Sequence, residues 1–216
     1  MRKTAVSIFV AIMAVAAFSV RSQADVQAGI SIGDGGVQGF YLAIGEFFKA
    51  PENEVVVVHE RKIPDDEIPV VYFIARRART TPEVIIKMRL GGESWMDISA
   101  HFGITADIYY VPVKHHPGPP YGKAYGHFKK RKRQEWKKVM LTDAEIINFV
   151  NLRFISEHYG YSPDEVIKMR GEGRDFVEIN GHAKQVHAEK MKSEEMASKD
   201  KAKGKSDKGK NKGKKK

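Results

Sequence analysis

The most concentrated charge in this sequence lies between Lys123 and Lys138, where eight Lys and Arg residues are accompanied by one acid, Glu135. Aromatic side chains are interleaved with these cations. Such a mixture can neutralise and stack on a polyanion, whether nucleic acid, phosphate-bearing envelope glycans or acidic lipid headgroups. The alternative is a solvated loop whose charges balance acidic residues elsewhere in the chain. The predicted anion-binding residues are Lys129, Lys130, Arg131, Lys132, Arg133, Lys137 and Lys138, with Tyr121, Tyr125 and Trp136 as stacking or apolar contacts.

The net charge of +10 is unevenly distributed along the chain. Residues 184–216 hold thirteen Lys and five acidic residues, whereas residues 1–24 hold three basic residues and no acid. The chain between these two segments is close to neutral. The Lys-rich tail is therefore expected to bind anionic surfaces weakly and non-specifically, or to serve only as a solubilising extension.

Histidines suggest a second kind of chemistry. His115, His116 and His127 lie in an insert that spans residues 107–140, and neutral imidazoles bind transition metals. The sequence has no Cys and no pair of His at ligand spacing on a helix, so no metal site is predicted. His101 and His182 lie 81 residues apart and are expected at helix ends, where a cation complements the helix dipole.

No nucleophile motif or phosphate-binding loop is present, so neither a catalytic residue nor a cofactor is predicted.

An internal repeat supplies the elements that must position these residues. The segment from Phe73 to His101 recurs 81 residues later without a gap, so that Ile86-Lys87-Met88-Arg89 aligns with Ile167-Lys168-Met169-Arg170. A weaker third copy begins near Tyr41. Repetition of this kind indicates stacked modules. The shared core is predicted to contain Ile86, Met88, Trp95, Ile98, Ile167, Met169, Phe176 and Ile179.

Local signals predict that these modules are mostly α-helical, built from short helix-turn-helix-like units stacked into one body. Thr81-Pro82-Glu83 supplies a cap, a proline at the first helical position and an acid near the positive helix end. Helices are expected from Thr142 to His158 and from Pro163 to Arg170. Val55 to Val58 is ambiguous, because four β-branched residues favour a strand whereas the repeat alignment favours a helix. A helix is the preferred prediction there.

Composition shifts divide the chain into six segments. A short positive start, an apolar run and a small-residue site indicate a signal peptide cleaved after Ala24; a retained membrane anchor is the alternative. Pro and Gly are too frequent between His115 and His127 to predict a regular element there. The predicted segments are the signal peptide (1–24), an irregular lead-in (25–36), the first helical units (37–106), a Pro/Tyr/His and basic insert (107–140), a second helical unit (141–183) and a disordered Lys-rich tail (184–216).

The pattern from Val84 to Ile104 resembles a helix-turn-helix DNA-binding unit. In that family the second helix enters the major groove and presents polar side chains to base edges. Here that helix offers Glu93, Asp97 and Ser99, with no Lys or Arg to neutralise phosphate. Sequence-specific DNA binding is therefore not expected, and a membrane-anchored DNA-binding regulator is the third alternative.

The whole plan, from signal peptide through tandem units to Lys-rich tail, resembles uncharacterised exported proteins of Gram-negative bacteria. That resemblance implies export and an all-helical repeat, and it transfers no functional residue. We expect a periplasmic or secreted, non-enzymatic protein with no membrane span after signal cleavage. It would engage an acidic envelope polymer or an anionic membrane surface through its insert and tail. The main alternative is a protein-interaction module that docks its partner on the helical body.

Overall fold

The computed structural model describes residues 36–210, with side chains as far as Lys199; this part of the chain is mostly helical and contains no strand. The predicted signal peptide and lead-in, apart from residue 36, lie outside the described residues. Every helix within residues 36–210 is too short or too polar to cross a bilayer. In chain order the elements are α1 (Gly36–Phe48), α2 (Glu52–Glu60), η1 (Asp65–Glu67), α3 (Ile68–Ala78), α4 (Pro82–Leu90), α5 (Trp95–His101), η2 (Ala106–Ile108), α6 (Gly122–Lys129), η3 (Arg133–Lys138), α7 (Asp143–Tyr159), α8 (Pro163–Gly171) and α9 (Phe176–Lys210).

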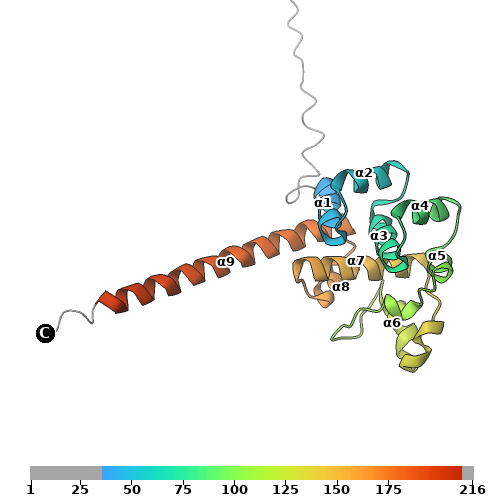
Figure 1. Cartoon of the computed structure of the whole chain (residues 1–216). Helices are drawn as coiled ribbons and strands as arrows, with labels where there is room; N and C mark the ends of the chain where they lie inside the picture. Colours follow the sequence, from blue (N-terminus) through green and yellow to red (C-terminus); the bar gives the residue numbers. More distant parts are fainter. Residues whose placement is uncertain (1–35, 211–216) are drawn as a thin grey trace, which may run out of the picture. The chain divides into compact units, whose positions relative to one another are not determined.

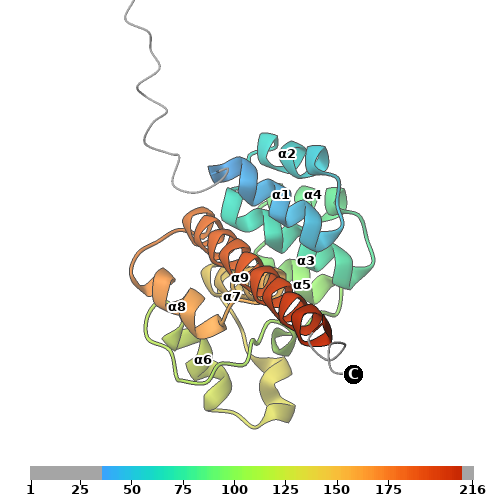
Figure 2. The same ribbon diagram turned by 90° about the vertical axis from the view of Figure 1, so that its left-hand side faces the viewer.

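The core forms where α1, α3 and α7 meet. Helix α3 packs against α7, and α1 contacts both of them (Figure 1). Helix α9 lies across α7 and also contacts α1 and α8 (Figure 2). Segments far apart in sequence therefore share one hydrophobic core.

Three times the chain turns from one helix into the next with the same backbone geometry. The residue at the turn has a positive φ: 59° at Lys49, 54° at Arg79 and 63° at Gly160. The next backbone N–H then donates to the carbonyl five residues earlier, at 2.9, 3.0 and 3.0 Å. The weak third copy predicted near Tyr41 is therefore a structural copy, offset by 30 residues from the second one.

The second turn of each copy repeats equally well. Its positive-φ residue is Lys62, Gly92 or Gly173, with φ of 71°, 92° and 95°. The N–H of each residue donates to the carbonyl three residues earlier, at 2.9, 3.0 and 3.1 Å. Val55 to Val58 lies within α2, so the helix preferred there is confirmed.

A capping box explains why α7 begins where the sequence predicted. Thr142 accepts the N–H of Glu145 at 3.3 Å, and the Glu145 carboxylate accepts the N–H of Thr142 at 2.9 Å. This reciprocal capping box starts α7. Pro82 and Pro163 are the first residues of α4 and α8, which confirms both predicted helix starts. The predicted cap from Thr81 is wrong in one respect, because its side chain accepts no capping hydrogen bond.

The buried positions match between copies. Val55, Ile85 and Val166 are each fully buried at one repeat position, as Ile68, Ile98 and Ile179 are at another. Ile68 also begins α3, so α3 closes the first unit and opens the second. The predicted core residues are all buried except Met88, which is half-buried: Ile86, Met88, Trp95, Ile98, Ile167, Met169, Phe176 and Ile179.

The insert is more ordered than predicted. Helix α6 occupies part of the stretch between His115 and His127 where no regular element was expected, and η3 follows it. Tyr121, Tyr125 and Phe128 recur at helical spacing and pack on Phe149 of α7. Burial of this apolar face offsets the cost of the glycines in α6, because most helix stability in proteins comes from packing.

Helix α9 has a buried beginning and an exposed remainder. Phe176, Ile179 and Ala183 face the core, whereas every side chain from Ala188 to Lys199 is exposed. The exposed part of this helix is thus not supported by packing. Disorder of the tail in solution therefore stays a prediction, and its last residues, 211–216, lie outside the described part of the chain.

Candidate functional site

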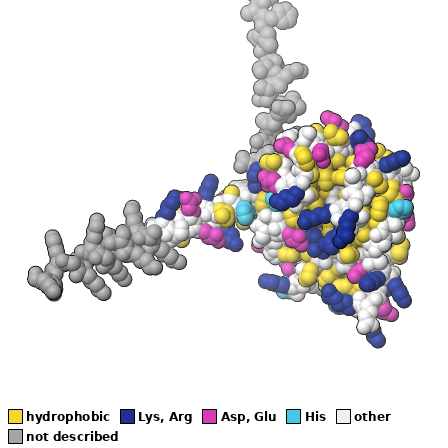
Figure 3. Space-filling model, viewed as in Figure 1, with side chains coloured by type: hydrophobic (Ala, Val, Ile, Leu, Met, Phe, Trp, Pro, Cys, Tyr) yellow, Lys and Arg dark blue, Asp and Glu magenta, His cyan; other side chains and the backbone are white. Residues whose placement is uncertain are grey.

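The predicted anion-binding cations all lie on residues 129–138, which we call the basic segment. It runs from the last residue of α6 through η3, and all seven of its Lys and Arg side chains are exposed. Figure 3 shows Lys and Arg side chains around the part of the surface where η3 lies in Figure 1. The exposed cations in question are Lys129, Lys130, Arg131, Lys132, Arg133, Lys137 and Lys138.

Trp136 fastens the basic segment to the body. Its indole N–H donates to the carbonyl oxygens of Phe128 and Arg131, at 3.0 and 3.2 Å. Its ring lies 4.5 Å from the Tyr110 ring, and the Arg133 guanidinium lies 4.9 Å from its centroid. The cations are therefore presented on an anchored turn rather than on a loose loop, which lowers the entropy lost when they bind.

Two of the predicted stacking residues are buried in the core rather than exposed for stacking, and that part of the prediction is wrong. Tyr121 is fully buried and Tyr125 is 4 % exposed. Their hydroxyls donate to the carbonyl oxygens of Asn148 at 3.3 Å and Val111 at 2.7 Å. Burial raises the pKa of both phenols well above the usual range. These rings hold α6 on the core, and only Trp136 keeps an exposed edge.

A concavity lies beside the basic segment, and we call it the insert hollow. Its volume is about 230 Å³. The exposed cationic or titratable side chains at its rim are Lys114, His115, His116 and Lys129. Its floor is aromatic and apolar. The lining residues are Tyr110, Val113, Lys114, His115, His116, Tyr125, Phe128, Lys129 and Trp136.

Asp164 holds one wall of the insert hollow in place. Its carboxylate accepts the backbone N–H of Lys114 and of His115, both at 3.2 Å. Burial acts to raise the pKa of Asp164, but these hydrogen bonds outweigh it, and the net pKa is lowered. Asp164 thereby joins α8 to a segment fifty residues earlier.

The histidines are not gathered into one cluster. His115 and His116 line the insert hollow, whereas His127 lies 3.3 Å from Glu145 on α7. His101 ends α5 as predicted, but His182 lies inside α9 rather than at a helix end, because α9 continues past the repeat. Within residues 36–210 no three His, Asp or Glu side chains are arranged to hold a metal ion.

The helix-turn-helix surface does not present the side chains that base reading requires. Ser99 is fully buried, where its hydroxyl donates to the Trp95 carbonyl at 2.6 Å and contacts the Tyr109 hydroxyl at 2.6 Å. Asp97 belongs to the cap of α5, bonded to Ser94. The pattern therefore serves packing and helix capping.

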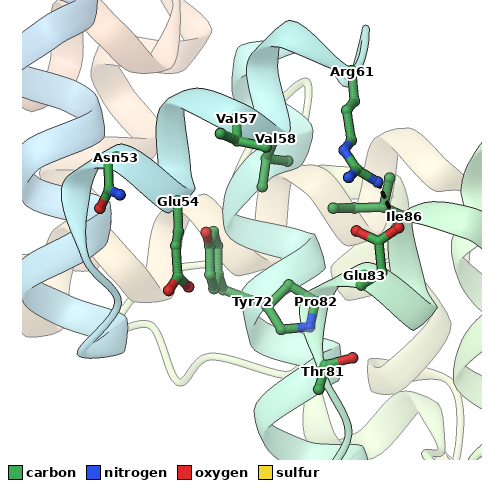
Figure 4. Close-up of a pocket in the computed structure, with 10 residues that line it drawn as sticks. All are labelled: Asn53, Glu54, Val57, Val58, Arg61, Tyr72, Thr81, Pro82, Glu83 and Ile86. Carbon is green, nitrogen blue, oxygen red and sulfur yellow. Dashed lines mark hydrogen bonds and ion pairs between the residues drawn. The ribbon is translucent and has the colours of Figure 1, made fainter.

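A second concavity lies between α2 and α4, and no sequence signal pointed to it (Figure 4). This α2–α4 groove has a volume of about 350 Å³, with Val57, Val58, Pro82 and Ile86 on its apolar wall. The ion pair of Arg61 with Glu83 closes one end. At its base Tyr72 is 5 % exposed, and its hydroxyl has no hydrogen-bond partner among the described residues. Burial and the nearby charge of Glu54 raise the pKa of Tyr72 to about 12.

The insert hollow and the basic segment thus form one cationic concave surface. Comparison with protein families, curated proteins and solved structures found no match to this chain. What the chain does must therefore follow from its own geometry.

Proposed function

We propose that this chain is an exported, non-enzymatic binding protein that holds a polyanion against its basic segment and insert hollow. The supporting observation is that seven exposed cations lie on one anchored turn beside a concavity rimmed by Lys114, Lys129 and two histidines. Long-range attraction brings the polymer to the basic segment. One phosphate or carboxylate group then enters the insert hollow, where the exposed edge of Trp136 contacts the polymer's carbon skeleton. Tail lysines add weak, salt-sensitive attraction.

A salt titration tests this proposal. Binding of labelled polyphosphate, with poly-L-glutamate as the carboxylate counterpart, is measured by fluorescence anisotropy on the chain from Asp25 onward. Replacing Lys129, Lys130 and Lys132 together by Gln should reduce the steepness of log affinity against log salt by about two. Each contact that is lost means fewer counterions released when the polymer binds. The matched control changes three exposed lysines outside the insert, Lys62, Lys87 and Lys168, to Gln.

Two outcomes would count against the proposal. An equal loss in both triple variants would show attraction by overall charge with no dedicated site. Binding that does not change with salt would exclude electrostatic tethering. Deletion of the tail after Ala183 should weaken binding modestly and leave the effect of the basic segment intact.

The α2–α4 groove supports a second candidate function, a protein-interaction module. Its wall is mostly apolar, and Val57 on it is 43 % exposed. A partner that inserts an apolar side chain there would form a complex that is insensitive to salt. Such a complex, lost in Val57→Glu and kept in the basic-segment variant, would favour this function over polyanion binding.

A further inference from the structure

The three helical units differ at one pair of positions near the end of their first helix. By the 30- and 81-residue offsets, Arg76 corresponds to Glu46 and Glu157. Arg77 corresponds in the same way to Phe47 and His158. The second unit therefore carries two adjacent arginines where the other two units carry an acid followed by an aromatic ring.

The equivalent helix ends in the other two units form without arginine at these positions. A cation near a helix C-terminus complements the helix dipole. This effect would explain Arg76 only if the other two units also carried a cation at that position. Yet Glu46 and Glu157 stand at that position in helices that end with the same turn geometry. Arg76 and Arg77 are exposed, and neither forms an ion pair or a hydrogen bond with another described residue.

Both arginines line a concavity, which we call the arginine groove. It lies where the ends of α1 and α3 meet α7, and its volume is about 350 Å³. Its apolar wall is made of Phe47, Phe48 and Phe73, and the Arg77 guanidinium lies 5.3 Å from the centroid of the Phe73 ring. Figure 3 shows Lys and Arg side chains gathered among apolar atoms on the face where α3 lies in Figure 1.

The positive charge of the arginine groove is not cancelled from within. Glu157 is its one acidic lining residue, and its carboxylate lies 3.1 Å from the Arg153 guanidinium. The other terminal nitrogen of Arg153 donates to the carbonyl oxygens of Ile108 and Tyr110, at 3.1 and 2.9 Å. Arg153 and Glu157 are thus committed to each other and to the backbone, which leaves the charges of Arg76 and Arg77 unbalanced.

From this arrangement we infer that the arginine groove binds a small planar organic anion, an aromatic ring that carries a carboxylate or a phosphate. The half-buried Phe47 and Phe48 supply ring edges and faces for the ligand, and the buried Phe73 backs the Arg77 guanidinium. Arg76 and Arg77 supply planar, forked donors that match the two oxygens of a carboxylate or phosphate. The groove volume lies within the usual range of small-molecule sites. This site is independent of the basic segment and of the polymer proposed to bind there.

The test is isothermal titration of the purified full chain with naphthalene-2-carboxylate and with 2-naphthyl phosphate, which distinguishes the two anionic groups. Saturable one-to-one binding is expected for at least one of them. The variant Arg76→Glu with Arg77→His should weaken it at least about tenfold, since charge-assisted hydrogen bonds are lost. That variant copies Glu157 and His158, a pair that the same helix end already carries in the third unit, so it should fold, with a melting temperature lowered only by loss of the Arg77 contact with Phe73.

Matched controls separate a site from general charge effects. Arg79→Gln removes one cation from the same helix end without touching the groove lining, and should change affinity by less than about twofold. The neutral analogue naphthalene-2-methanol should bind at least about tenfold more weakly than the anion. Absence of saturable binding by both anions, equal weakening in Arg79→Gln, or equally tight binding of naphthalene-2-methylamine would each overturn the inference. Loss of binding in the Lys129, Lys130 and Lys132 variant would also overturn it, by moving the site to the basic segment.

Discussion

Arg89 and Arg170 occupy the same position in the second and third helical units, and each lays its guanidinium over the aromatic residue six positions later. The guanidinium carbon lies 4.6 Å from the Trp95 ring centroid in one unit and 4.8 Å from the Phe176 centroid in the other. Each also donates a hydrogen bond to the carbonyl four residues later, at 3.1 and 2.7 Å. These shared contacts close the turn between the short helix and the next one.

The two arginines differ in what they join. Arg89 makes a two-pronged ion pair with Glu67, at 2.8 Å for both bonds, and a further pair with Asp143 at 2.6 Å. Asp143 also accepts the backbone N–H of Trp95 at 2.8 Å. Arg170 has no ion pair among the described residues. The same local motif thus closes a turn in both units, and only the second unit uses it to connect η1 with the start of α7.

Replacing the aromatic residue in each unit should produce the largest stability losses. Trp95→Ala and Phe176→Ala should each lower the free energy of unfolding by about 3–5 kcal/mol, because both side chains are almost fully buried. The loss at Trp95 should be the larger one, since its side chain is the bigger of the two and its removal leaves the larger cavity. Urea unfolding followed by circular dichroism measures both. Melting behaviour unchanged in both variants would contradict the repeated core.

Replacing Arg89 or Arg170 should give a larger difference in stability between the two units than replacing the aromatic residues does. Arg89→Met should cost about 3 kcal/mol, since it leaves the Glu67 carboxylate, 11 % exposed, without its partner. Arg170→Met should cost about 1 kcal/mol, the scale of a cation–π contact. The same urea titration compares them. Equal losses would mean that the ring contact dominates in both units and that the ion pairs of Arg89 contribute little.

The sequence was sufficient to predict the repeat because its signals act over a few residues. A capping Thr or Ser, a Pro at the first helical position and a Gly just after a helix each determine local backbone geometry without help from distant segments. The helix at Val55 to Val58 was harder, since strand propensity opposed it. There the alignment to the other copies outweighed propensity, which is a weak guide in short apolar runs.

The insert and the concavities could not be predicted in this way, because each depends on residues far apart in sequence. Tyr125 was assigned to a ligand surface, and its burial follows from Phe149 on α7. The role of Asp164 depends on two backbone groups fifty residues away. The spacing of Tyr121, Tyr125 and Phe128 was a usable signal for α6, but the surrounding Pro and Gly residues obscured it.

The smallest expected effect tests how closely the units match at their first turn. Arg79 and Gly160 have φ of 54° and 63°, in the left-handed region where a side chain costs about 1 kcal/mol and glycine costs nothing. Gly160→Ala should therefore destabilise the protein by about 1 kcal/mol, and Arg79→Gly should stabilise it by a similar amount. Urea unfolding would show both effects as shifts of the midpoint concentration, with an unchanged dependence of the unfolding free energy on urea. Destabilisation by Arg79→Gly would mean that the arginine contributes more through its side chain than its backbone conformation costs, and that the second unit has a stabilising contact at this turn that the third unit lacks.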